Sequence, residues 1–294
     1  MSGTEDIDPR FAALEDWDDD TLAATLLETQ VAAARAAQAA GPALARAIAK
    51  AAARLAAGGR MLYLGAGTSG RLAVLDAAEL PPTFDWPASR AQALIAGGER
   101  ALIRAIEGAE DDGPAAVAAL DAAGLDARDV VIGVAASGRT PYTVAGLAHA
   151  RARGALTVAI LNAPGTPLAA AAEIALVADT GAEIIAGSTR MKAGTAQKIL
   201  LNCLSTGIMV RLGHVYRGRM VEMRPTNAKL RQRAIRMVAD LTGEPEIRAA
   251  GALDAGGTIK TAVVMLALGL DREGAEARLE QAGGLLARAL AAQG

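Results

Sequence analysis

Three glycines follow an apolar run near residue 62 and could shape an anion-binding loop. Gly65, Gly67 and Gly70 form a G-x-G-x-x-G pattern within the stretch LYLGAGTSGRLAVLDAAELPPTF. Dinucleotide binding would also require an acidic residue at the end of the second strand, which holds the ribose hydroxyls. The second apolar run, ASRAQALIA, has no acidic residue before Glu99. The pattern therefore favours a loop that holds a different phosphate group.

Small hydroxyl residues accompany glycine in three loops that precede helical stretches. The loops are GAGTSGR, AASGRTP and AGSTRMKAGTAQK. Serine and threonine there are individually typical of helix N-caps, but hydroxyls and free backbone N–H groups together suit a phosphate monoester. Three such loops at one edge of a sheet predict a binding site. The residues that we expect to bind phosphate are Gly67, Thr68, Ser69, Ser137, Gly138, Arg139, Thr140 and Ser188.

The acidic residues near these loops carry no clear signal from their spacing. Glu79 stands just before LPPTF, and the segment EGAEDD contains Glu107, Glu110 and two aspartates. From spacing alone, Glu79 is interpreted as an ordinary acid near a helix end that Pro81 stops. The EGAEDD segment is interpreted as a solvated loop.

Composition limits the classes of partner. The chain of 294 residues has 30 Lys+Arg against 32 Asp+Glu, and no basic block that would predict nucleic-acid binding. Cys203, His149 and His214 do not form a metal-ligand pattern, so we expect no metal. The acidic N-terminus lacks a signal-peptide pattern, and no apolar stretch approaches the ~20 residues of a membrane span. We therefore expect a cytoplasmic protein that binds a small molecule.

The pattern of apolar residues along the chain predicts an α/β fold with helical ends. Residues 20–57 have helical spacing with a break at Gly41-Pro42, and residues 190–213 form one long amphipathic stretch. We expect a helical N-terminal region (1–54), a three-layer, doubly wound domain (55–224) and a small helical cap domain (225–294). Short β-branched runs between helical stretches predict a parallel sheet of about five strands. These runs are RMLYLGAG, RAQALIAGG, DVVIGVAASG, LTVAILNAPG and EIALVAD.

Several long motifs in order resemble the N-acetylmuramic acid 6-phosphate etherases, which belong to the sugar isomerase (SIS) domain superfamily. Besides the first glycine-rich stretch, they are IAGGERALIRAIEGAEDD, DVVIGVAASGRTPYTVAGL, GSTRMKAGTAQKILLNCLSTGIM, TNAKLRQRA and GGTIKTAVVML. The resemblance implies an SIS fold and cleavage of the C3 lactyl ether of N-acetylmuramic acid 6-phosphate. The products would be N-acetylglucosamine 6-phosphate and D-lactate, formed during the recycling of cell-wall sugars. The two functional glutamates of the family fall on Glu79 and Glu110.

The implied chemistry needs two carboxyl groups and no cofactor. In the open-chain aldehyde the C2 proton is acidic, so its removal lets lactate leave from C3, and water then adds at C3. We assign Glu110 as the base that takes the C2 proton and Glu79 as the acid that protonates the ether oxygen. Glu79 would then need a raised pKa, which burial could provide.

Helix length raises a question about Glu79. If one helix runs from Ser69 to Glu79, a rise of ~1.5 Å per residue puts this carboxylate about 15 Å from the phosphate loop. Either the helix is short or irregular, or a second subunit completes the site. SIS-type proteins are commonly dimers, so the resemblance implies a homodimer with pockets near the subunit boundary.

Two other functions remain open at this point. An aldose-ketose isomerase would need the same C2 proton abstraction but no leaving group. A non-catalytic phosphosugar sensor is the second alternative, because the glucokinase regulatory proteins resemble this family, although they contain two tandem SIS domains. Lys260, in GGTIKTAVVML, is interpreted as a surface lysine at a helix start.

Overall fold

The structure is a computed structural model that describes residues 3–291, and its chain divides into two compact units. The first unit extends to Ala78 and resumes over Ala88–Ile208, and the second contains Glu79–Pro87 and the chain from Met209 onward. Apart from one sharply bent helix pair, Glu246–Gly256 with Ile259–Leu268, no described helix has the length and apolarity that a membrane span requires.

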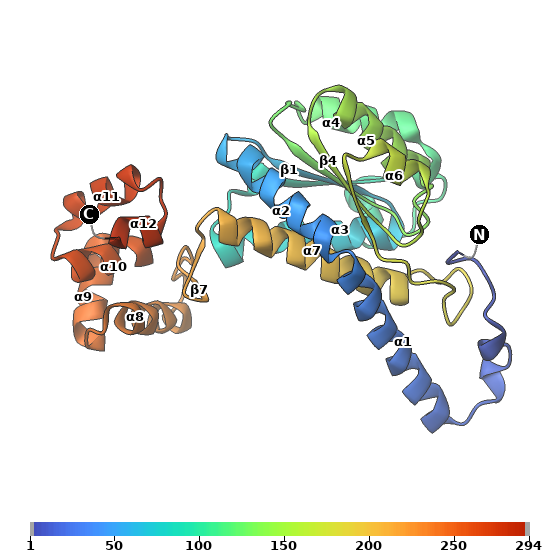
Figure 1. Cartoon of the computed structure of the whole chain (residues 1–294), viewed down its shortest axis with the longest axis horizontal. Coiled ribbons are helices and arrows are strands. Elements are labelled where there is room, and N and C mark those ends of the chain that lie inside the picture. Colours follow the sequence, from blue (N-terminus) through green and yellow to red (C-terminus); the bar gives the residue numbers. More distant parts are fainter. Residues whose placement is uncertain (1–2, 292–294) are drawn as a thin grey trace. The chain divides into compact units, whose positions relative to one another are not determined.

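A five-stranded parallel sheet forms the centre of the first unit (Figure 1). Its strands are β1 (Met61–Gly65), β2 (Ala91–Ile95), β3 (Val130–Val134), β4 (Leu156–Leu161) and β5 (Ile174–Val177). Three of them, β1, β3 and β5, are continuous apolar runs, as expected for strands that are covered on both faces. All five match the runs expected from the sequence. The spatial order is β2-β1-β3-β4-β5, so the chain reverses its direction of winding between β1 and β3.

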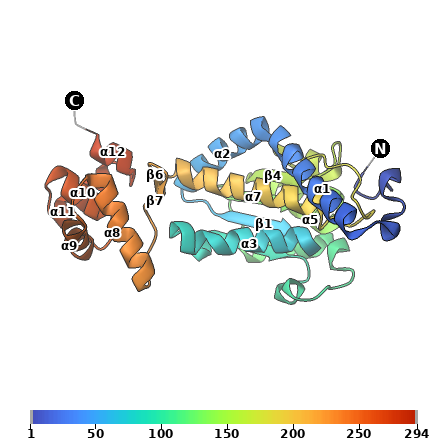
Figure 2. The same ribbon diagram turned by 90° about the horizontal axis from the view of Figure 1, so that it is seen from below.

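Helices cover both faces of this sheet, which gives the three layers that the sequence predicts. One face carries α4 (Gly113–Ala122), α5 (Pro141–Ala152) and α6 (Pro167–Ala171) (Figure 1). Their Leu120, Leu147 and Leu168 form one core with Leu62 and Leu64 of β1. The other face carries α2 (Gly41–Ala56), α3 (Gly67–Phe84) and α7 (Lys192–Arg211), with α3 beneath β1 (Figure 2). The helix α1 (Asp19–Ala39) precedes α2, and the break falls at Ala40, next to the expected Gly41.

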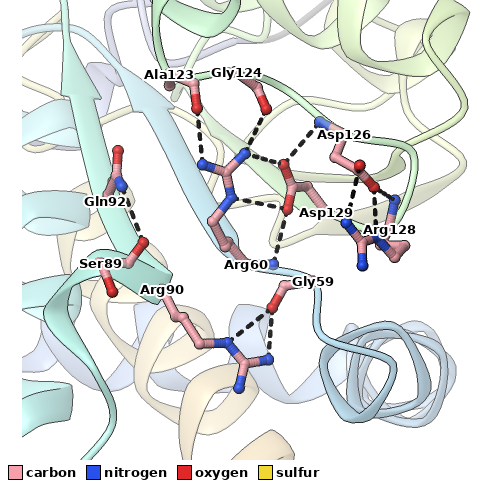
Figure 3. Close-up of polar contacts among 10 residues, drawn as sticks. All are labelled: Gly59, Arg60, Ser89, Arg90, Gln92, Ala123, Gly124, Asp126, Arg128 and Asp129. Carbon is pink, nitrogen blue, oxygen red and sulfur yellow. Dashed lines mark hydrogen bonds and ion pairs between the residues drawn. The ribbon is translucent and has the colours of Figure 1, made fainter.

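Arg60 and Asp129 join the amino-terminal ends of β1 and β3 (Figure 3). Arg60 donates to Asp129 through its backbone N–H and through Nε and Nη2, the last at 2.6 Å. The same guanidinium donates to the carbonyls of Ala123 and Gly124, each at 2.8 Å. Nearby, Arg90 donates to the carbonyl of Gly59. These polar groups therefore stabilise the amino-terminal edge of the sheet.

The second unit is mainly helical and contains a hairpin that the sequence did not predict. The hairpin pairs β6 (Val215–Tyr216) with β7 (Arg219–Met220). The helices that follow share one apolar core. They are α8 (Ala228–Thr242), α9 (Glu246–Gly256), α10 (Ile259–Leu268), α11 (Arg272–Gln281) and α12 (Leu286–Leu290). Five short 3-10 helices complete the described elements: Pro9–Phe11, Leu14–Asp16, Ala88–Arg90, Glu99–Leu102 and Ala109–Asp111.

His214 explains why Glu79–Pro87 belongs to this second unit. The ring lies edge-on against Phe84 and Trp86, and its Nδ1 is 2.8 Å from the carbonyl oxygen of Phe84. Burial lowers the pKa of His214, which favours the neutral ring in this aromatic setting. The last turn of α3 therefore packs with the C-terminal part of the chain.

Lys260 is not the surface residue that the sequence suggested. Its side chain is buried in the second unit, where it forms an ion pair with Glu222 and donates to the carbonyl of Gly284 at 2.7 Å. A buried ammonium group needs such partners, because desolvation without them is costly. Helical periodicity at the start of α10 could not indicate these partners, because Glu222 and Gly284 lie 38 and 24 positions away from Lys260 in the chain.

Candidate active site

A pocket of about 430 Å³, which we call the main pocket, opens at the carboxyl ends of β1 and β3. Because the strand order reverses between these two strands, this edge is the place where doubly wound sheets bind ligands. The pocket brings together the loop after β1, the loop after β3 and the segment before α4. It is lined by Glu5, Ala66, Gly67, Thr68, Ser69, Glu110, Asp111, Ala136, Ser137, Arg139, Thr140, Pro141 and Thr189.

The first side of the main pocket is the N-terminus of α3. Gly67, Thr68 and Ser69 form the first turn of this helix, so their backbone N–H groups lie where a helix presents unpaired donors. The turn is tight because Gly70 packs on β1: a Cβ at Gly70 would lie 2.8 Å from the carbonyl oxygen of Gly65. The third glycine of the G-x-G-x-x-G pattern thus serves helix-strand packing.

The second side is the loop between β3 and α5. Ser137, Arg139 and Thr140 line the pocket, and Thr140 precedes α5 without making a side-chain capping hydrogen bond. Gly138, also expected to bind phosphate, is buried behind them. It has a φ of +63°, and a Cβ there would lie 2.3 Å from Oγ1 of Thr166, so only glycine fits this turn. Gly138 shapes the loop without lining the pocket.

The third loop contributes less than its sequence suggests. Thr189 lines the main pocket, but Ser188 does not. The N-terminus of α7 is already occupied, because the buried carboxylate of Glu183 accepts from the backbone N–H groups of Lys192 and Ala193 at 3.0 and 2.8 Å. Lys192 is itself buried and donates to backbone carbonyls of the preceding loop. This helix end binds a protein carboxylate in place of an external anion.

The two glutamates occupy different positions. Glu110 lies in the 3-10 helix Ala109–Asp111 and lines the main pocket, so the interpretation of EGAEDD as a plain solvated loop was incomplete. Glu79 does not line this pocket. The helix α3 runs without a break from Gly67 to Phe84, past Pro81, so it is neither short nor stopped there. Both glutamates are exposed, and a single chain therefore lacks the burial expected around Glu79.

A buried polar cluster fixes α3 against β1 and α7. Asp76 accepts hydrogen bonds from the Tyr63 hydroxyl at 3.1 Å, from Nδ2 of Asn202 at 3.1 Å and from the Ser205 hydroxyl at 3.2 Å. Burial raises the pKa of Asp76, and burial together with this carboxylate raises the pKa of Tyr63. The cluster holds in place the helix whose first turn forms the main pocket and whose later turn carries Glu79.

Some pocket residues had no signal in the sequence. Glu5 reaches the main pocket because the N-terminal segment folds back, and the backbone N–H of Gly187 donates to the carbonyl of Thr4. Asp111 and Thr189 were adjacent to expected residues but were not singled out. Within residues 3–291, no group of three or more His, Cys, Asp or Glu side chains is arranged to hold a metal ion.

Comparison with known proteins first gives the class. A model of the SIS domain matches residues 102–206, and a model described as the N-terminal SIS domain of glucokinase regulatory protein matches residues 43–151. A solved phosphoheptose isomerase from Francisella tularensis is 16% identical, with a TM-score of 0.47, over 65% of this chain and 97% of its own. The fold and these models define an SIS-domain protein.

The curated relatives then give the family. An N-acetylmuramic acid 6-phosphate etherase of Deinococcus radiodurans is 53% identical over 96% of this chain and 92% of its own length. The enzyme of the same name from Symbiobacterium thermophilum is 56% identical over 74% of this chain and 72% of its own length. The chain belongs to the N-acetylmuramic acid 6-phosphate etherase family.

Proposed function

We propose that this protein is a carbon-oxygen lyase that releases D-lactate from N-acetylmuramic acid 6-phosphate and leaves N-acetylglucosamine 6-phosphate. The observation that carries this function is the 53% identity to a named etherase over 96% of the chain. The reaction serves amino-sugar recycling. It requires a phosphate-binding loop and a base, and the main pocket provides suitable groups for both.

The proposed binding mode places the sugar phosphate in the main pocket. The first turn of α3 offers backbone N–H groups, and Thr68, Ser69, Ser137 and Thr140 offer hydroxyls. Arg139 adds a positive charge. Hydrogen bonds to charged phosphate oxygens are stronger than neutral ones, so this donor set favours the dianionic end of the substrate. Gly138 shapes the loop, and Ser188 is proposed only as a support for its neighbour Thr189.

In the proposed mechanism Glu110 removes the C2 proton of the open-chain aldehyde, and Glu79 protonates the ether oxygen at C3. The C3–O bond breaks, lactic acid leaves as lactate, and a C2–C3 double bond conjugated with the aldehyde remains. The roles then reverse: the carboxylate of Glu79 activates water for addition at C3, and Glu110 returns a proton to C2. Glu110 lines the main pocket, which supports its role as the base.

A homodimer with shared sites resolves the position of Glu79. Along the unbroken α3, ten residues at ~1.5 Å each separate Glu79 from Ser69 by about 15 Å, which is long for one hexose phosphate. We propose that Glu79 serves a site completed by a second copy of the chain. An exposed apolar stripe on α1, with Leu27 at 70% and Val31 at 52% exposure one turn apart, fits a subunit contact.

Localisation belongs to the proposal as well. Cys203 is a free, exposed thiol, which fits a reducing compartment, and we propose that the enzyme works in the cytoplasm.

The test of function uses lactate as the readout. Wild-type protein should release one D-lactate for each N-acetylmuramic acid 6-phosphate, and Glu79→Gln and Glu110→Gln should each reduce turnover by more than 10³-fold while still binding N-acetylglucosamine 6-phosphate. An aldose-ketose isomerase would instead convert a hexose phosphate to a ketose without lactate. A sensor would bind the phosphosugar with no turnover at all, and the match to the regulatory-protein model makes that control worth including.

A further inference from the structure

A second, smaller pocket lies directly beside the main pocket and has no role in the chemistry described so far. We call it the side pocket. Its volume is about 220 Å³, and it shares Ala66, Gly67 and Glu110 with the main pocket. Because Glu110 lines both spaces, a sugar whose C2 faces this carboxylate has the side pocket next to its C2 and C3 substituents.

The side pocket combines small apolar groups with four charged side chains, two arginines and two glutamates. Its apolar lining is Ala66, Ala96, Ala101, Ala105, Ile106 and Ala109. Arg71 and Arg104 also line it, as does Glu107. Arg71 donates through Nε and Nη2 to the carbonyls of Leu102 and Arg104, each at 3.1 Å, and this fixes the segment that carries Arg104.

The guanidinium of Arg104 has no ion-pair partner among residues 3–291. The segment between Glu99 and Asp111 that surrounds it is anchored at both ends, by the 3-10 helices Glu99–Leu102 and Ala109–Asp111. A guanidinium without an ion-pair partner, lining a small pocket rich in alanine, is suited to a ligand group that combines a carboxylate with a methyl group.

We propose that the side pocket is the subsite for the lactyl group of the substrate, with Arg104 pairing with the lactyl carboxylate. This inference rests on the proposed function. The lactyl group is the substituent at C3, and it carries one carboxylate and one methyl group, which match the arginine and the alanine-rich lining. The acetamide at C2 is the competing occupant, but it is neutral and gives a guanidinium no anionic partner.

The subsite has a defined kinetic signature. The lactyl carboxylate keeps its charge before, during and after cleavage of the C3–O bond, so Arg104 binds ground state and transition state alike. Loss of such uniform binding raises KM and leaves kcat nearly unchanged. Arg104 is therefore a substrate-binding residue that selects the muramic acid ether over the corresponding sugar without it.

The experiment compares Arg104→Ala with Arg100→Ala, a matched control on the same segment that does not line the side pocket. Two readouts are measured: lactate release from N-acetylmuramic acid 6-phosphate, and exchange of the C2 proton of N-acetylglucosamine 6-phosphate in D₂O. The exchange uses the phosphate loops and Glu110 but involves no lactyl group. Arg104→Ala should raise KM for lactate release about 10- to 100-fold and leave the exchange rate within about twofold. Arg100→Ala should change neither.

A substrate whose lactyl carboxylate is converted to the amide gives a second, independent comparison. Wild-type protein should prefer the carboxylate, and Arg104→Ala should lose most of that preference. Equal losses in lactate release and in exchange would overturn the subsite and assign Arg104 to the acetamide or to the sugar itself. An unchanged KM would overturn it too. Absence of lactate release in the wild type would refute the proposed function instead, so the two failures are distinguishable.

Discussion

Asp76 is a buried carboxylate on α3 that does not line the main pocket. It accepts hydrogen bonds from Tyr63, Asn202 and Ser205, yet burial still raises its pKa. At a pH below 3.8, the ordinary pKa of an aspartate in the unfolded chain, Asp76 is protonated in both the native and the unfolded state. Its contribution to folding stability is then fully present. As pH rises above that value the unfolded chain releases the proton first, so the contribution of Asp76 to stability falls.

Asp76→Asn should therefore become more stable relative to wild type as pH rises from about 4 to 7. The amide oxygen can keep the hydrogen bonds from Asn202 and Ser205, and the amide N–H can donate to the Tyr63 hydroxyl. Urea unfolding of both proteins across this pH range measures the difference in their free energies of unfolding. The contributions of other titrating groups largely cancel in that difference. Asp76→Ala is the control: it leaves buried donors unpaired and should be about 2–3 kcal/mol less stable than Asp76→Asn at every pH, because neither replacement titrates. A difference for Asp76→Asn that does not vary with pH would contradict the account.

The role of a residue could be predicted from the sequence where it belongs to a local motif, but not where it depends on partners far away in the chain. The hydroxyl-rich loops are local motifs, and Thr68, Ser69, Ser137 and Thr140 do line one pocket. Lys260 was misjudged because the partners that permit its burial, Glu222 and Gly284, lie far away in the sequence. The carboxylate of Glu183 accepts from the first N–H groups of α7, which the sequence also did not indicate, and Ser188 does not line the pocket.

At the scale of elements, the two edges of the sheet have different roles: one carries a stabilising polar network and the other carries the pocket. The amino-terminal edge is closed by Arg60 and Asp129 (Figure 3), and Asp129 is 1% exposed. The carboxyl edge carries the main pocket. Removing one partner of a buried pair leaves the other charge uncompensated. Stability and binding should therefore be separable by mutation at opposite edges.

Asp129→Ala should lower the free energy of unfolding by about 3 kcal/mol, because it leaves Arg60 and the backbone N–H of Asp126 without their acceptor. The folded fraction should keep its KM and kcat. Arg128→Ala removes an exposed partner of Asp126 and should leave the melting temperature unchanged. Thermal and urea unfolding, with lactate assays below the transition, check both. Equal stability of Asp129→Ala and wild type would show that the network does not hold this edge together.

The elements themselves were well predicted where hydrophobic patterning decides structure. All five strands fell within the apolar runs, since buried parallel strands are continuous in sequence. The end of α3 was predicted too early, because a proline such as Pro81 usually ends a helix. In the structure α3 continues to Phe84, and the buried side chains of Leu80 and Phe84 stabilise its last turn. The hairpin β6–β7 escaped prediction because its strands have only two residues each.

At the scale of the whole molecule, the account requires two chains for each complete site. If Glu79 of one copy works with Glu110 of the other, a heterodimer of Glu79→Gln and Glu110→Gln contains one site with both changes and one with neither. Each variant alone should be inactive. Equal mixtures, unfolded and refolded together, should regain about a quarter of wild-type lactate release, because half of the dimers are mixed and each has one intact site. Sedimentation checks that dimers form. No recovered activity from verified mixed dimers would place both glutamates in one chain.

Cleavage of the ether by elimination and water addition can be tested by following where the oxygen of water is incorporated. Wild-type protein is incubated with N-acetylmuramic acid 6-phosphate in water enriched in oxygen-18, and both products are analysed by mass spectrometry. Elimination breaks the bond between C3 and the ether oxygen, and water then adds at C3. The account therefore predicts the label at C3 of N-acetylglucosamine 6-phosphate and unlabelled D-lactate. Lactate that carries the solvent oxygen in its hydroxyl group would contradict it.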